Sequence, residues 1–194
     1  MGVIVDIDGT LYDDAALFVR AFRAVGVRIR QADINEWDFW RHHVDGPTFH
    51  RLIREHFHGP EAILDNVPYP DAAPTLQRWA SLGAQIHIVS DRHTEAVPAT
   101  AAWLAAHGIP AHTLATMSGP EKVAYATANG LRILIDDKPD TIIAAREAGL
   151  VTAALHTRYN REALVHPDTV GGSSWGVIAR RLERRCPHLR ERPR

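Results

Sequence analysis

The chain alternates short apolar runs with longer stretches in which apolar residues recur at helical spacing. Several of the short runs are apolar on both faces, which is typical of parallel strands covered by helices on either side. Strands are predicted over five runs: Val3–Asp8, Gln85–Ser90, Ala111–Ala115, Arg132–Asp136 and Val151–Leu155.

Helices are predicted between these strands, over Ala72–Leu82, Thr94–His107, Pro120–Ala128 and Thr141–Ala148. A glycine lies just beyond each of them, where a left-handed C-cap belongs: Gly83, Gly108, Gly130 and Gly149. The repeated order of helix, glycine and strand predicts an α/β fold with an open, central parallel sheet.

Residues 11–71 interrupt this order. They contain helical patterns over Ala15–Ala24 and Thr48–His56 and lack the strand pattern. We therefore expect a core domain of residues 1–10 and 72–194, with residues 11–71 as a small helical cap inserted after the first strand. Gly171-Gly172-Ser173-Ser174 is predicted to be a flexible connection before a last helix, Trp175–Arg185.

Composition narrows the classes of partner. The 194 residues carry 22 Lys and Arg against 23 Asp and Glu, so no global field favours a nucleic acid polymer or a membrane. The single cysteine, Cys186, excludes an intrachain disulfide, and no signal peptide or ~20-residue apolar run is found. We expect a cytoplasmic protein. The arginine-rich tail, residues 180–194, is expected to be a solvated helix end and a frayed terminus, and the oligomeric state stays open.

The first strand carries the strongest chemical signal. Asp6 and Asp8 are two residues apart, so in a strand both carboxylates point to the same side. Carboxylates that close repel each other unless a cation lies nearby, and a hard cation such as Mg²⁺ takes oxygen ligands. The alternative is an ordinary strand that runs into an Asp-Gly turn.

Three further polar features follow predicted strands or begin a predicted helix: Ser90, Lys122, and the pair Asp136-Asp137. In parallel α/β sheets ligands bind outside the carboxyl ends of the strands, so the fold would bring these features to the rim that holds Asp6 and Asp8. Taken singly, Lys122 could be a surface lysine and the acidic pair a polar loop.

Together the four features resemble the motifs of the haloacid dehalogenase (HAD) superfamily in its phosphatase branch. Those motifs are DxDG[TV], a strand-ending Ser or Thr, a Lys, and an acidic pair. The resemblance covers roughly residues 3–157. It implies a Rossmann-like core and a phosphomonoesterase that forms an aspartyl-phosphate.

The resemblance also implies residue roles. Asp6 would be the nucleophile, and Asp8 would protonate the leaving group and then activate water. Mg²⁺ would be held by Asp6, by the backbone carbonyl of Asp8, and by the acidic pair. Within the pair, the ligand would be Asp136, Asp137 or both. Thr10 would help to hold Asp8 in position or contact substrate.

Phosphate binding is implied for Ser90 and Lys122. The run Ser90-Asp91-Arg92 is similar to the T-x-R of the nucleotidase-like subgroup, which includes 5′(3′)-deoxyribonucleotidases. Arg92 is therefore a candidate phosphate or substrate contact, and His93, which follows it at the same rim, is a candidate substrate contact.

The predicted cap is rich in aromatic residues: Trp37, Phe39, Trp40, Phe49 and Phe57. Most are expected to form a small hydrophobic core. Trp37 and Trp40 are the candidates for a substrate-facing edge, because nucleotide bases stack on such rings.

The leading hypothesis is a magnesium-dependent phosphatase of a small phosphomonoester, with nucleoside monophosphates as the favoured class. A sugar-phosphate or biosynthetic-pathway phosphatase is the alternative. A phosphomutase also fits the motifs, whereas dehalogenase relatives lack an acid at the position of Asp8. From another class comes a non-catalytic protein that binds phosphate ligands.

Overall fold

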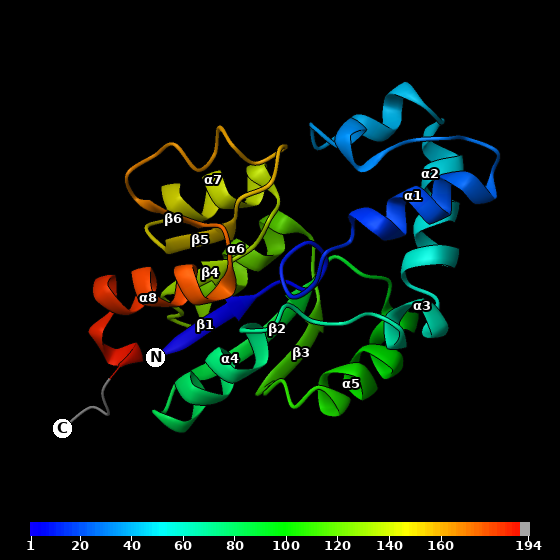
Figure 1. Cartoon of the computed structure of the whole chain (residues 1–194). Helices are drawn as coiled ribbons and strands as arrows, with labels where there is room; N and C mark the ends of the chain where they lie inside the picture. Colours follow the sequence, from blue (N-terminus) through cyan, green and yellow to red (C-terminus); the bar gives the residue numbers. More distant parts are fainter. Residues whose placement is uncertain (191–194) are drawn as a thin grey trace.

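The computed structural model describes residues 1–190, and its centre is one six-stranded parallel sheet in the order β3-β2-β1-β4-β5-β6 (Figure 1). The strands are β1 (Gly2–Val5), β2 (Gln85–Ser90), β3 (Thr113–Thr116), β4 (Ile133–Ile135), β5 (Val151–Leu155) and β6 (Thr169–Gly172). The predicted α/β fold with a Rossmann-like parallel sheet is confirmed.

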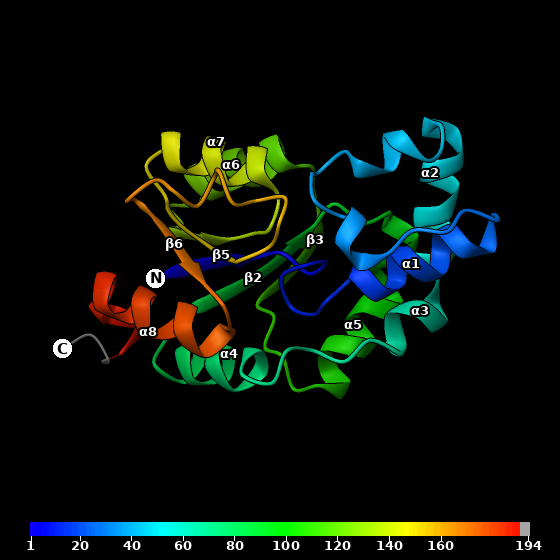
Figure 2. The same cartoon turned by 45° about the horizontal axis from the view of Figure 1, so that its top comes forward.

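Helices cover both faces of the sheet (Figures 1 and 2). They are α4 (Ala72–Ser81), α5 (Val97–Ala106), α6 (Gly119–Ala128), α7 (Pro139–Glu147) and α8 (Trp175–Arg185). Ile4 packs in the apolar cluster with residues of α6 and α7, while Val3 and Val5 pack in the cluster with residues of α4, α5 and α8. This alternation along β1 is the period of two expected for a strand buried on both faces.

Two differences from the sequence expectation concern element bounds. β1 ends at Val5, so Asp6 and Asp8 lie in the turn that follows the strand. Gly171 and Gly172, expected to be flexible, form the end of β6 and pair with Ala154 and Leu155 of β5. The four predicted capping glycines all have a positive φ, as a left-handed C-cap requires.

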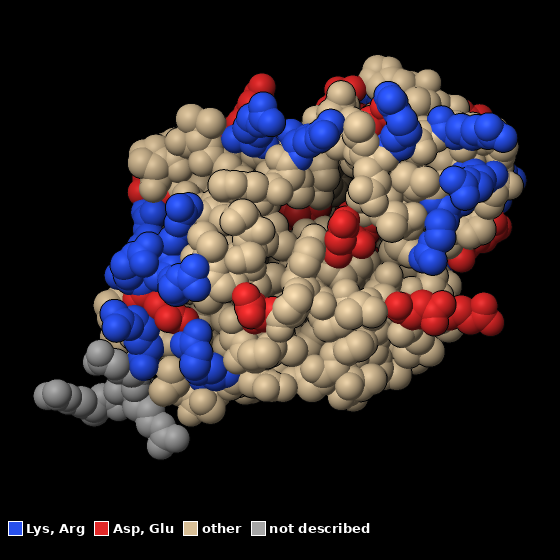
Figure 3. Space-filling model, viewed as in Figure 1, with Lys and Arg blue, Asp and Glu red and all other residues tan. Residues whose placement is uncertain are grey.

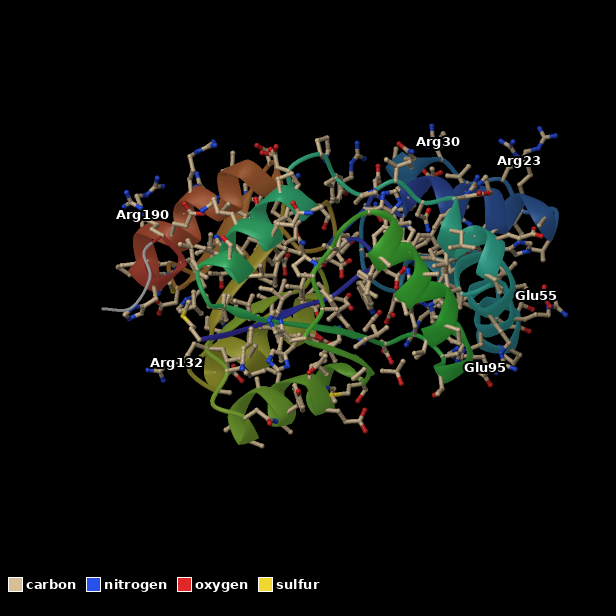
Figure 4. All side chains as sticks on the ribbon, turned by 90° about the horizontal axis from the view of Figure 1, so that it is seen from below. Arg23, Arg30, Glu55, Glu95, Arg132 and Arg190 are labelled. Atoms are coloured by element: carbon tan, nitrogen blue, oxygen red, sulfur yellow. The ribbon has the colours of Figure 1, made fainter. Side chains whose placement is uncertain are left out.

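Between β1 and α4 the chain is helical and adds no strand to the sheet. The segment holds the helices α1 (Ala15–Ala24), α2 (Gly46–Leu52) and α3 (Pro60–Leu64). It also holds the short helical turns η1 (Gln31–Asp33), η2 (Phe39–His42) and η3 (Ile53–Phe57). Two further short turns, η4 (Thr94–Ala96) and η5 (Pro187–Leu189), lie outside this segment. Its helices lie beyond one end of the sheet (Figure 1). Charged side chains such as Arg23, Arg30 and Glu55 are exposed and point outward (Figure 4).

Two further observations concern the termini and membranes. Among residues 1–190, no helix is both long enough and apolar enough to cross a bilayer. The arginine-rich tail is described as far as Arg190, through the end of α8 and η5, and its last four residues lie outside the described range.

Candidate active site

The sheet brings the predicted site residues to one edge. Val5 pairs with Ile135, so Asp6 and Asp136 come directly after neighbouring strands. The backbone N–H of Asp6 donates to the carbonyl of Ile135 at 2.9 Å, which continues the ladder past the end of β1. Ser90 ends β2 on the other side of β1. This is the carboxyl edge, where ligands bind in parallel α/β folds.

Asp6, Asp136 and Asp137 form a buried acidic cluster, in which one carboxylate oxygen of each lies within 4.8 Å of the others. Lys122 reaches this cluster from α6. Its Nζ lies 2.8 Å from Asp6 Oδ1 and 2.8 Å from Asp136 Oδ2. The cluster therefore holds three carboxylates and one ammonium, which contacts two of them, in a place shielded from water.

The electrostatics of the cluster reflect this imbalance. Burial raises the pKa of Asp6 to about 7, although the Lys122 ammonium lowers it. Burial and the charges of Asp136 and Asp6 hold the pKa of Asp137 well above its usual value. For Lys122 burial alone would lower the pKa, but Asp136 and Asp6 raise it beyond the ordinary lysine value. The two carboxylates therefore favour the charged form of Lys122.

The donor set fits Mg²⁺. All three ligand side chains of the cluster offer carboxylate oxygens, which hard divalent cations prefer, and a cation would neutralise charge that Lys122 alone leaves uncompensated. The carboxylate of Asp8 lies outside this group. Any part that Asp8 takes in holding a cation is left to its backbone carbonyl, as the resemblance implied.

Asp137 is fixed by contacts that sequence reasoning missed. Tyr159, in the loop after β5, donates its hydroxyl to Asp137 Oδ2 at 2.5 Å, and Asn160 Nδ2 donates to the Asp137 carbonyl at 3.3 Å. Gly9 lies against the same carboxylate with φ of +66°. Nothing in the sequence marks Tyr159 or Asn160, because their role depends on where a loop folds back.

The Asp8 carboxylate forms an ion pair with a different cation, the guanidinium of Arg92. Arg92 binds both of its carboxylate oxygens, and Tyr12 donates its hydroxyl to Asp8 Oδ1. Ser90 Oγ donates more weakly to Asp8 Oδ2, at 3.3 Å. Burial alone would raise the pKa of Asp8, but the charge and hydrogen bonds of Arg92 hold it well below its usual value. The two aspartates of the motif therefore have separate partners.

Thr10 does not contact Asp8 through a hydrogen bond. Its buried hydroxyl has no hydrogen-bond partner among residues 1–190, and its carbonyl accepts from Trp175 Nε1 at 2.7 Å. In the structure Thr10 ties the turn after β1 to α8.

The helical segment contributes a small aromatic cavity of about 80 Å³ beside the acidic cluster. Trp37 and Trp40 line it together with Tyr159, whose hydroxyl reaches Asp137. Trp40 stacks on Phe49 with ring centroids 4.3 Å apart, and Trp37 meets Tyr159 edge-on at 5.6 Å. Of the remaining aromatics, Phe39 and Phe57 are buried in the core, and Phe39 and Phe49 also line the cavity.

Two residues of this region were missed from the sequence. Asp14 lines the cavity, and burial together with the charges of Asp8 and Asp13 raises its pKa to about 8. His58 lies beside the predicted candidate His93, with ring centroids 5.2 Å apart, and its Nδ1 accepts the His93 backbone N–H at 3.4 Å. A hollow opens between the sheet and the helical segment, with acidic side chains in and beside it (Figure 3).

Comparison with known proteins places the fold. No protein-family model matches the chain. A Chlorobaculum tepidum protein named "Putative 5'(3')-deoxyribonucleotidase" is 30% identical over 137 residues, which are 66% of this chain and 60% of that protein. The chain thus spans about three fifths of the length of this relative.

Solved structures match over nearly the whole chain. A haloacid dehalogenase-like hydrolase from Streptococcus pneumoniae has a TM-score of 0.67 at 17% identity, covering 92% of this chain and 97% of that one. A HAD family hydrolase from Deinococcus radiodurans, with bound phosphate and sodium, has a TM-score of 0.64 at 15% identity, covering 100% and 98%. CbbY from Rhodobacter sphaeroides, in complex with phosphate, has a TM-score of 0.62 at 18% identity, covering 92% and 94%. The chain therefore has the fold of the haloacid dehalogenase-like hydrolases, as the motif residues predicted.

Proposed function

We propose that this protein is a Mg²⁺-dependent phosphomonoesterase that works through an aspartyl-phosphate on Asp6. One observation carries the proposal: Lys122 bridges Asp6 and Asp136 in a buried cluster that is short of positive charge. Such a cluster favours binding of a divalent cation, beside which the oxygens of a phosphate ester can bind. Asp6, Asp136 and Asp137 would hold Mg²⁺, which when bound neutralises their charge and that of the phosphoryl oxygens.

The side chains divide the reaction between them. The Asp6 carboxylate attacks phosphorus, the bond from phosphorus to the leaving oxygen breaks, and Asp8 passes to that oxygen the proton that the ester carries as its monoanion. Water then attacks the phosphorus of the aspartyl-phosphate while Asp8 takes its proton, and phosphate leaves with Asp6 restored. Lys122 and Ser90 hold phosphoryl oxygens during both steps.

The substrate class that we propose is a nucleoside monophosphate. The aromatic cavity supports it, because Trp37 and Trp40 line a space that adjoins the acidic cluster through Tyr159. Stacking of a base on such rings contributes about 1–3 kcal/mol. The name of the Chlorobaculum tepidum relative points to the same class.

We further propose that residues 11–71 act as a cap over a core of residues 1–10 and 72–190. Contacts from this segment to the site support the division, since Trp37 lies 5.3 Å from Lys138 Nζ and Arg158 Nη1 donates to the Ala32 carbonyl at 3.1 Å. The cap would select the leaving group, because the core binds only the phosphate end of the substrate.

The test is release of phosphate from a panel of esters, with Mg²⁺ and with EDTA. Turnover of p-nitrophenyl phosphate only with Mg²⁺, and a higher kcat/KM for nucleoside monophosphates than for sugar phosphates, is expected. Equal or higher kcat/KM for sugar phosphates would transfer the assignment to that class. Phosphate binding without any turnover would leave a non-catalytic phosphate-binding protein.

A further inference from the structure

Arg92 is the cation that pairs with Asp8. Arg92 Nε donates to Asp8 Oδ2 at 2.8 Å, and Nη2 donates to Asp8 Oδ1 at 2.8 Å. Such a two-point pair fixes the plane of the carboxylate as well as its position. The Arg92 side chain is 2% exposed and that of Asp8 is 22% exposed. Asp8 therefore faces the open site, and Arg92 lies beneath it.

Most N–H groups of the Arg92 guanidinium are already hydrogen-bonded to protein groups. Its Nη1 donates to Thr100 Oγ1 of α5 at 2.9 Å, and its Nη2 also donates to the Tyr12 hydroxyl at 2.9 Å. Four of its five N–H groups are therefore used inside the protein. Tyr12 in turn donates to Asp8, which closes a ring of hydrogen bonds around the carboxylate.

The positions of the partners explain why this arrangement is needed. Asp8 lies in the turn beyond β1, two residues from Asp6 of the acidic cluster, and its backbone forms an isolated bridge with Tyr12. Arg92 follows β2 directly, and Thr100 belongs to α5, which packs on β3. The hydrogen bonds of Arg92 to Asp8 and to Thr100 form a clamp that ties the Asp8 carboxylate to the end of β2 and to α5.

We propose that Arg92 is a positioning residue, held by Thr100 and Tyr12, that orients the Asp8 carboxyl group toward the leaving oxygen. The proposal rests on the proposed phosphatase function. It differs from direct binding of phosphate by Arg92, which stays an outcome of the test. In this account the oxygens of the phosphate are served by Lys122 and Ser90.

Thr100 offers the sharpest experiment, because it touches Arg92 and is not placed at the substrate. The variants are Thr100→Val, which removes the hydroxyl at nearly constant shape, Thr100→Ser, which keeps it, and Arg92→Lys. Thr141→Val is the matched control, since Thr141 is equally buried and its hydroxyl has no hydrogen-bond partner among residues 1–190. Each is assayed with Mg²⁺ and a nucleoside monophosphate, whose alkoxide leaving group needs a proton, with inorganic phosphate as competitive inhibitor, and its melting temperature is measured.

A positioning role predicts losses in kcat alone. Arg92→Lys should lower kcat about 100-fold, which is the lower end of what a lost general acid costs, and Thr100→Val, which removes only one support of Arg92, about tenfold. KM and the inhibition constant of phosphate should stay within about twofold, and Thr100→Ser and Thr141→Val should behave as wild type.

Two results would overturn the proposal. A tenfold weaker inhibition by phosphate in Arg92→Lys, with kcat nearly unchanged, would make Arg92 a phosphate contact. Wild-type kcat in Thr100→Val and Arg92→Lys would leave the clamp without a role. If Arg92→Lys fails to fold, the Thr100 pair decides alone. Failure of the proposed function is separate, because the wild-type protein would then release no phosphate from any ester.

Discussion

Gly9 lies in contact with Asp137, so closely that a Cβ atom at Gly9 would clash with Asp137 Oδ2. Gly9 also has φ of +66°, a conformation that side chains other than glycine disfavour. We expect Gly9→Ala to displace Asp137, to remove the stabilisation of the protein by Mg²⁺ in thermal unfolding, and to abolish turnover. Gly26→Ala is the matched control, because Gly26 has φ of +79° and a Cβ atom added there would have no neighbouring heavy atom within 4 Å. Both variants should lose about 1–2 kcal/mol to strain, but Gly26→Ala should keep the effect of Mg²⁺. Equal behaviour of the two would show that the contact with Asp137 is unimportant.

The two lysines of the chain give a second comparison. Lys122 is buried between two carboxylates, whereas Lys138 is 29% exposed and lies 3.9 Å from the exposed Asp91. Without Mg²⁺, Lys122→Met should lower the free energy of unfolding by about 3 kcal/mol, because it leaves buried carboxylates without a counter-charge. Lys138→Met should cost about 0–1 kcal/mol. Urea unfolding in EDTA measures both, and a loss in Lys122→Met no larger than in Lys138→Met would contradict the charge balance described above.

The sequence predicted those site residues that follow strands. Asp6, Ser90 and Asp136 could be found because apolar runs mark the strands and parallel strands share one carboxyl edge. Lys122 could be found as the start of the next helix and one of only two lysines. The clamp on Asp8 could not, since Tyr12, Arg92 and Thr100 meet only through the packing of α5 against the sheet.

The missed strand β6 has a similar cause. Its Gly171 and Gly172 carry no side chain that could reveal an alternating pattern, so they resemble a linker. In the structure they are needed because neighbours pack onto the strand: a Cβ at Gly171 would clash with His156 Nε2, and one at Gly172 would lie 2.8 Å from Ile178 Cγ1. Glycine here permits close approach and not flexibility.

His58 predicts a dependence of stability on pH. Burial lowers its pKa from 6.5 to about 4, although the charge of Asp8 raises it. Between these values the unfolded chain binds a proton that the folded protein does not, so the free energy of unfolding falls as pH falls from 6.5 to about 4. Above pH 6.5 His58 is neutral in both the folded and the unfolded chain, so the free energy of unfolding no longer changes with its protonation.

The variant His58→Gln should lack this part of the slope, which is at most about 1.4 kcal/mol per pH unit. Urea unfolding across the window, compared with wild type and with the exposed-site variant His188→Gln, measures it. An unchanged slope in His58→Gln would show that His58 takes up its proton equally in the folded and unfolded chain.

Trp37 tests the assignment of the cavity to the leaving group. Its ring is 40% exposed and lies against Tyr159 and Lys138, which come from the loops after β5 and β4. Trp37→Ala should lower kcat/KM for nucleoside monophosphates about tenfold, which corresponds to the loss of one stacked ring, and should hardly change it for sugar phosphates. The ratio of the two kcat/KM values is the measurement, so a general loss of activity cancels. A ratio equal to that of wild type would place the base elsewhere.

We propose that the phosphoryl group of the substrate is transferred to Asp6. The most direct measurement is mass spectrometry of the peptide that contains Asp6, after the protein has turned over a phosphate ester with Mg²⁺ and been quenched rapidly in acid. The account predicts a gain of one phosphoryl group on Asp6 in the wild-type protein, and neither this gain nor turnover in Asp6→Asn. Turnover by Asp6→Asn at the wild-type rate, or phosphoryl transfer directly to water with no modified Asp6 at any quench time, would contradict it.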